Sequence, residues 1–158
     1  MGAQLLHRRG HAAQQAPARD RRQHQVHIGQ LFDDFEAAGG LAGDTAESFR
    51  TGKVVEWAAE LTSRTIADGL RTQSVGQRNF AHIQAFVDGI VTVTEAEIRA
   101  AMRAIVATAR LVPEPSGAVA AAALLFHAAE LPAYRKAVAV VSGGNVDPKQ
   151  LAEVLSEA

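Results

Sequence analysis

The stretch Val138–Asn145, with the sequence VAVVSGGN, does most to decide the fold. Its first four residues are apolar and rich in β-branched side chains, which is typical of a strand buried on both faces. The two glycines that follow let the backbone turn sharply and approach a bound group closely. We therefore predict Ser142 at the carboxyl end of a central strand, where open α/β sheets bind ligands. Taken alone, Ser-Gly-Gly-Asn is also common turn chemistry.

The segments around this stretch alternate between helix and strand signals. Downstream, Asp147 and Pro148 supply an N-cap and a first-turn proline for a closing helix through Leu155. Upstream, Thr94 and Glu97 have capping-box spacing ahead of a helix to about Arg110. The sequence further predicts a helical stripe at Phe80, Ile83 and Val87, a short buried strand over Ile90–Val93, and a helix from Ser116, as its cap, to about Leu131.

Composition agrees with one globular unit. The chain has 158 residues, of which 47% are hydrophobic and 21% charged, enough to build one core. A net charge of -1 gives no reason to expect a nucleic acid or an acidic membrane as partner. The sequence has no cysteine, no apolar stretch of membrane-spanning length and no secretory signal, so we expect a cytoplasmic protein.

The first thirty residues differ from the rest. They are dense in Arg, His, Gln and Ala and contain four of the six histidines. His7 with His11, and His24 with His27, have spacings that would suit a metal ion, but no cysteine or well-placed carboxylate completes a zinc site. We interpret residues 1–30 as a poorly ordered extension or as a gene artefact. After it, Leu31 to Phe35 are spaced for one helix face, and Gly39-Gly40 would end that helix.

Four ordered motifs give the chain a family resemblance. They are the segments Thr65–Leu70 (TIADGL), Ile90–Glu97 (IVTVTEAE), Leu111–Ala118 (LVPEPSGA) and Val138–Asn145. In this order and at these intervals, they resemble the C-terminal part of the threonine dehydratase and serine racemase family, pyridoxal-phosphate enzymes of the tryptophan synthase β-chain type. The resemblance runs from about Asp44 to Leu155. It implies an α/β fold: the C-terminal portion of a three-layer open sheet with helices on both faces, here as a partial dehydratase domain over residues 31–158.

The resemblance also implies roles for particular residues. Ser142 would donate a hydrogen bond to the unprotonated ring nitrogen of pyridoxal phosphate, and Gly143, Gly144 and Asn145 would shape its loop. Glu114 would lie near the cofactor ring. Asp68 and Gly69 would lie in the loop against the cofactor face. Alternatively, Glu114 is a helix-entry carboxylate beside Ser116, and Asp68 is a structural cap.

A divalent cation is a further implication. In the family, carboxylate and carbonyl oxygens near this position bind one, and Asp44 with the carbonyl of Ala42 are the matching positions, so we consider magnesium. The glutamate of the family pattern falls on Ala38, which leaves two ligands of a set that needs several oxygens. The alternative, which we favour, is that Asp44 caps a short helix over Ala46–Arg50.

The lysine that the family needs has no counterpart. Its mechanism uses a lysine that forms the internal Schiff base, in a Ser-x-Lys-x-Arg-Gly setting. The only lysines are Lys53, Lys136 and Lys149, and none has that setting. The asparagine loop that would face the ring and the glycine-rich phosphate loop are also missing from the sequence.

Three functions fit these observations. The first is a truncated threonine or serine dehydratase (ammonia-lyase) that is inactive alone. The second is a half-enzyme completed by a separate N-terminal polypeptide that carries the lysine. The third is a non-catalytic domain that keeps a ligand site for regulation. The resemblance implies a small amino-acid substrate and a homo-oligomer, without separating dehydration from racemisation.

Overall fold

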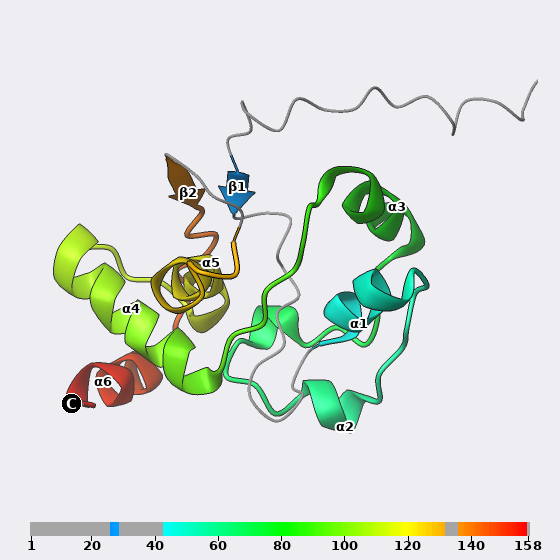
Figure 1. Cartoon of the computed structure of the whole chain (residues 1–158). Coiled ribbons are helices and arrows are strands. Elements are labelled where there is room, and N and C mark those ends of the chain that lie inside the picture. Colours follow the sequence, from blue (N-terminus) through cyan, green and yellow to red (C-terminus); the bar gives the residue numbers. More distant parts are fainter. Residues whose placement is uncertain (1–25, 29–42, 132–135, 158) are drawn as a thin grey trace, which may run out of the picture.

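A computed structural model describes residues 26–28, 43–131 and 136–157, most of which are helical (Figure 1). For residues 26–28, only the backbone is described. The elements, in chain order, are β1 (Val26–Ile28), α1 (Asp44–Thr51), α2 (Ala59–Thr62), the short 3-10 helix η1 (Asp68–Leu70), α3 (Gln77–Phe86), α4 (Glu95–Ala109), α5 (Pro115–Phe126), β2 (Ala137–Ala139) and α6 (Pro148–Ser156).

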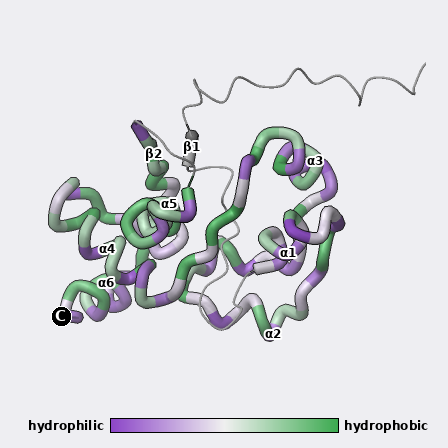
Figure 2. The backbone as a smooth tube through the Cα atoms, in the orientation of Figure 1, coloured by the Kyte–Doolittle hydropathy of each residue, from purple (hydrophilic) through white to green (hydrophobic). Residues whose placement is uncertain are grey.

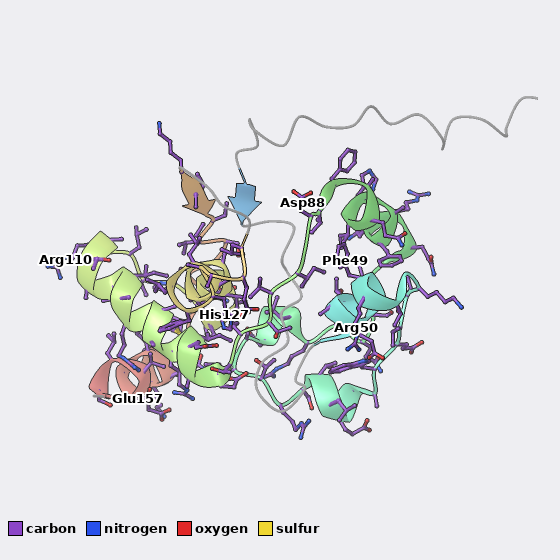
Figure 3. All side chains as sticks on the ribbon, viewed as in Figure 1. Phe49, Arg50, Asp88, Arg110, His127 and Glu157 are labelled. Carbon is purple, nitrogen blue, oxygen red and sulfur yellow. The ribbon has the colours of Figure 1, made fainter. Side chains whose placement is uncertain are left out.

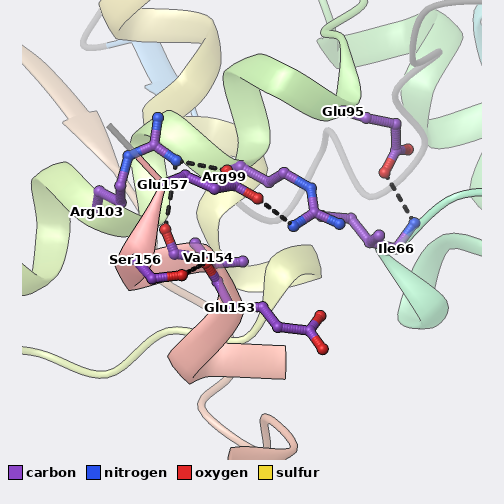
Figure 4. A network of polar contacts seen from close by, with 8 residues as sticks. All are labelled: Ile66, Glu95, Arg99, Arg103, Glu153, Val154, Ser156 and Glu157. Atoms are coloured by element: carbon purple, nitrogen blue, oxygen red, sulfur yellow. Dashed lines mark hydrogen bonds and ion pairs between the residues drawn. The ribbon is translucent and has the colours of Figure 1, made fainter. Parts of the chain in front are cut away.

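The main core forms around α5, which contacts α4, η1 and β2. Hydrophobic residues run along most of α5 (Figure 2), and its Ala118, Val119 and Ala122 are buried. Facing them are Ile98 and Met102 of α4. Helix α6 packs on α4, and Glu157 at its end pairs with Arg99 and Arg103 of α4 at 2.8 Å each (Figure 4).

Local sequence signals explain where α4 and α6 begin. The Thr94 N–H donates to Glu97 Oε2 at 2.7 Å, and the Glu97 N–H donates to Thr94 Oγ1 at 3.2 Å. This reciprocal pair satisfies two N–H groups that a helix start leaves without partners, and it confirms the predicted capping box. Asp147 likewise accepts from the N–H groups of Lys149 and Gln150, as the sequence predicted.

A second, smaller cluster joins α1 and α3. Phe80 and Ile83 of α3 are buried with Val75, and the half-buried Phe49 of α1 packs against them (Figure 3). The helical stripe predicted at Phe80 and Ile83 is therefore confirmed, with Val87 half-buried just after the helix.

The sheet has two parallel strands within the described residues. β1 pairs with β2 in the register Val26↔Ala137, His27↔Val138 and Ile28↔Ala139. The prediction of a strand buried on both faces is wrong, because Val138 is 49% and Val140 37% exposed. Ala139 and Val141 pack against the main core, so one face of β2 is covered and the other is not.

The predicted strand over Ile90–Val93 is also wrong. Val91 and Val93 are buried, but the segment is not part of a strand. A strand needs a neighbour to share its backbone hydrogen bonds, and no element within the described residues pairs with this one. The three-layer sheet predicted for the α/β fold is thus seen only as the β1–β2 pair.

Parts of the predicted organisation lie outside the described residues, including His7, His11, His24 and the segment Leu31–Gly40. β1 falls inside the range assigned to the N-terminal extension, and the division at residue 30 stays a prediction. Among the described residues, no helix is both long enough and apolar enough to cross a membrane.

Candidate functional site

The loop Ser142–Asn145 follows β2 and is bound to the start of α5. The Glu114 N–H donates to the Gly143 carbonyl at 3.0 Å. The Asn145 N–H donates to Glu114 Oε2 at 2.9 Å. Two of the predicted motifs, far apart in the sequence, therefore meet through Glu114.

Glycines allow this close approach. A Cβ on Gly143 would lie 2.4 Å from the Glu114 carboxyl carbon, and one on Gly144 would lie 2.8 Å from the Val112 carbonyl oxygen. From the helix side, a Cβ on Gly117 would lie 2.5 Å from the Gly143 carbonyl oxygen. Gly117 was not predicted as a site residue. A glycine inside a helix lowers stability relative to alanine, so Gly117 could have indicated that another backbone packs closely against α5.

The turn at Asp68 and Gly69 reaches the same end of α5. The Gly69 N–H donates to Ser116 Oγ at 3.0 Å and to Asp68 Oδ1 at 2.9 Å. Ser116 therefore contacts this turn, and the prediction that it caps α5 is wrong. Glu114 occupies the N-cap position instead, with Pro115 in the first turn, and α5 ends at Phe126, short of the predicted Leu131.

Glu95 supports the turn from α4. Its Oε1 accepts from the Thr65 hydroxyl at 2.5 Å. Its Oε2 accepts from the Ile66 N–H at 2.9 Å (Figure 4). The Arg71 guanidinium donates to the Thr65 carbonyl at 2.7 and 3.1 Å. This role of Glu95 was not predicted, because a glutamate in the first turn of a helix is common and does not indicate a distant contact.

The residues that meet at the start of α5 form a largely exposed polar surface. Ser142, Gly144, Asn145, Asp68 and Gly69 are exposed, whereas Gly143 and Glu114 are half-buried. A serine hydroxyl such as that of Ser142 is neutral and can both donate and accept hydrogen bonds. The arrangement can therefore offer one neutral donor to a ligand that lies against the start of α5.

The predicted cation site is described only in part. Asp44 is buried as the first residue of α1, and the Thr45 hydroxyl lies 3.4 Å from its Oδ2. Gly43, not Asp44, occupies the N-cap position, so the helix-cap interpretation of Asp44 is wrong. Ala42 lies outside the described residues, and within them no three His, Asp or Glu side chains gather to hold a metal.

His127 links the end of α5 to the start of α4. Its Nδ1 lies 2.6 Å from Glu130 Oε1, and its Nε2 lies 3.2 Å from Glu97 Oε1. The hydrogen bond to Glu130 raises the pKa of His127, against the effect of burial and with help from Glu97. Burial raises the pKa of Glu97, but hydrogen bonds from Thr94 and His127 outweigh it, so the net shift of this pKa is downward. His127 thus connects the end of α5 to the start of α4 through these two carboxylates.

The three lysines are exposed and sit on separate segments. Lys53 follows α1, Lys136 precedes β2 and Lys149 lies in α6. None belongs to the segments that meet at the start of α5.

Comparison with known proteins finds relatives that cover most of the chain. The sequence model of the family described as "Pyridoxal-phosphate dependent enzyme" matches residues 38–143. An L-threo-3-hydroxyaspartate ammonia-lyase of Saccharomyces cerevisiae is 37% identical over 113 residues, which cover 72% of this chain and 33% of that enzyme. A catabolic L-threonine dehydratase of Escherichia coli is 36% identical over 112 residues, covering 69% and 32%.

A solved structure agrees with these matches. The structure of maize serine racemase is similar with a TM-score of 0.63 and 32% identity, covering 75% of this chain and 37% of that one. The chain therefore spans about a third of the length of the relatives it matches.

Proposed function

Because the chain belongs to the family of pyridoxal-phosphate-dependent enzymes, as a partial member of its ammonia-lyase and racemase group, we propose that it carries the ring-nitrogen side of their cofactor site. We propose further that it lacks the covalent anchor and is inactive alone. The observation that carries the proposal is the meeting of the Ser142 loop and the Asp68 turn at the start of α5.

The residues fit the ring side of the cofactor. The exposed Ser142 hydroxyl is a neutral donor, the kind of group that suits an unprotonated pyridine nitrogen. Gly143, Gly144 and Asn145 would shape the loop that carries this hydroxyl, and Glu114 binds that loop. Gly69, next to Asp68, contacts Ser116 at the start of the same helix. When bound, pyridoxal phosphate supplies an electron sink, and the ring-nitrogen partner tunes it.

The missing lysine sets the limit of the proposal. A lysine in this family binds the cofactor aldehyde and moves protons, and no lysine of this sequence has the matching setting. The names of the relatives point to small amino acids, such as threonine, as substrates of a complete site. This chain would contribute cofactor binding to such a reaction and no proton transfer by lysine.

Pyridoxine 5′-phosphate tests the site, because it has no aldehyde and cannot label lysines. Titrated into the chain and followed by amide chemical shifts, it should perturb Asp68, Gly69 and residues 142–145. Ser142→Ala should weaken this response, whereas Ser63→Ala, an exposed serine after α2, should leave it unchanged. Shifts that are absent, or that spread equally over α1 and α3, would contradict the proposal.

A second candidate function is a half-enzyme completed by another polypeptide. It is favoured by the apolar side chains that stay exposed on or just after β2 and at the end of α5, namely Val138, Val140, Leu125 and Phe126. Mixing the chain with the N-terminal two thirds of a threonine dehydratase relative should then release ammonia from L-threonine. No gain over either polypeptide alone would exclude this pairing.

Two further features stay proposals. Magnesium would bind at Asp44 and the carbonyl of Ala42, and Asp44→Asn should then abolish any rise in the unfolding temperature caused by the ion. We also propose that the chain forms a homo-oligomer, and light scattering over a range of concentrations measures the oligomeric state directly.

A further inference from the structure

The Glu114 carboxylate does not cap its own helix. Glu114 is the N-cap residue of α5, yet its side chain makes no capping hydrogen bond there. It turns instead to a segment about thirty residues away in the sequence, where Oε2 accepts from the Asn145 N–H at 2.9 Å. Its main-chain N–H donates to the carbonyl of Gly143 at 3.0 Å. One residue thus binds both sides of Gly144.

We propose that Glu114 is a positioning residue, which fixes the direction of the Ser142 hydroxyl without contacting the cofactor itself. The inference rests on the proposed function, because it concerns the loop that would meet the ring nitrogen. Ser142 is exposed, so few of its own contacts restrain it, and its direction depends on the backbone that follows. That backbone is Gly-Gly, the most permissive pair of residues, and it needs an external restraint to hold one conformation.

The geometry shows how that restraint works. A carboxylate oxygen accepts hydrogen bonds, and a bond from an N–H group to a carboxylate is stronger than one to a neutral acceptor. Gly143 lies directly against this carboxylate, since a Cβ at that position would overlap it. Gly117 closes the other side against the Gly143 carbonyl. The loop is therefore held between a side chain and a helix.

Amide hydrogen exchange of the full chain tests this restraint without any ligand. Glu114→Leu removes the acceptor and keeps much of the side-chain volume, whereas Glu114→Gln keeps an acceptor without the charge. In E114L, exchange at Asn145 should accelerate about tenfold, since a hydrogen bond to a charged acceptor commonly contributes that much to a local opening equilibrium. E114Q should restore most of the protection. Glu56→Ala, at an exposed glutamate between α1 and α2, should change nothing at Asn145.

Exchange at Ile98 in α4 reports whether each variant is folded. If E114L unfolds, E114A takes its place under the same criterion, since it removes the acceptor without adding apolar bulk. Unchanged exchange at Asn145 in a folded variant without the acceptor would overturn the inference. So would an E114Q that exchanges as fast as that variant, because the oxygen would then not be what holds the loop.

The cofactor analogue separates this inference from the proposed function. With pyridoxine 5′-phosphate, the shift of the Ser142 amide should persist in E114Q and disappear in E114L. A wild-type chain that gives no shift contradicts the proposed function, while the exchange measurement still decides whether Glu114 holds the loop. A shift that is equal in E114L and wild type overturns the positioning role alone.

Discussion

Helix α4 and the β2 segment, residues 137–145, are stabilised in opposite ways. α4 begins with a capping box formed by two residues three positions apart, and its Ile98, Met102 and Ile105 are all buried. β2 has one open face, and its loop is held by Glu114, about thirty residues away. The helix therefore follows from local sequence, whereas the strand and the candidate site depend on distant contacts.

The largest loss of stability should come from a substitution in the buried face of α4. Met102→Ala removes a fully buried side chain and should lower the free energy of unfolding by about 2–5 kcal/mol, since it leaves a cavity. Val138→Ala on the open face of β2 should cost less than about 0.5 kcal/mol. Urea denaturation measures both, and similar losses would remove the distinction between the regions.

Gly117 tests how tightly the loop is packed on α5. Gly117→Ala places a Cβ against the Gly143 backbone, which should cost about 1–3 kcal/mol and shift the amide resonances of residues 142–145. Gly89→Ala is the matched control, because a Cβ there meets nothing within 4 Å. A neutral Gly117→Ala with unmoved loop resonances would show that the loop does not lie on the helix as described.

The start of α4 should respond to a smaller degree. Thr94→Ala deletes one half of the capping box and should destabilise the chain by about 1 kcal/mol. Thr108→Ala removes a hydroxyl that donates to the Ala104 carbonyl in the same helix, and it should be nearly neutral. Thermal unfolding of the two variants measures the difference, and equal midpoints would contradict the role of the cap.

The smallest effect is a dependence on pH at the junction of α4 and α5. The lowered pKa of Glu97 gives stability that is present above its ordinary value of 4.5 and is lost as pH falls. The raised pKa of His127 gives stability that is present below 6.5 and is lost as pH rises through the folded-state value. Their joint contribution should be greatest between these two values.

A His127→Gln variant makes this window measurable. Its difference in unfolding free energy from the wild type should be largest between pH 4.5 and 6.5 and shrink above it. The difference should stay below about 1 kcal/mol, because these ion pairs are partly exposed to solvent. A difference that does not vary with pH would assign His127 a packing role only.

The same contrast explains what the sequence could predict. The capping box at Thr94, the cap at Asp147 and the stripe at Phe80 and Ile83 are local patterns, and all three are confirmed. The strands were predicted less well, because an apolar run such as Val138–Val141 does not reveal whether other elements cover one face of the strand or both. The motifs correctly indicated the family, whose model matches residues 38–143. The Glu114–Asn145 contact could be found only from the three-dimensional structure, since no sequence-spacing rule connects those positions.

The central claim is a cofactor-binding side without a covalent anchor, and reductive labelling tests it most directly. The chain is mixed with pyridoxal phosphate, reduced with borohydride, and digested to map the modified lysines. We predict substoichiometric label spread over Lys53, Lys136 and Lys149, all of which are exposed. One label per chain at a single lysine, lost when that lysine becomes alanine, would contradict the account.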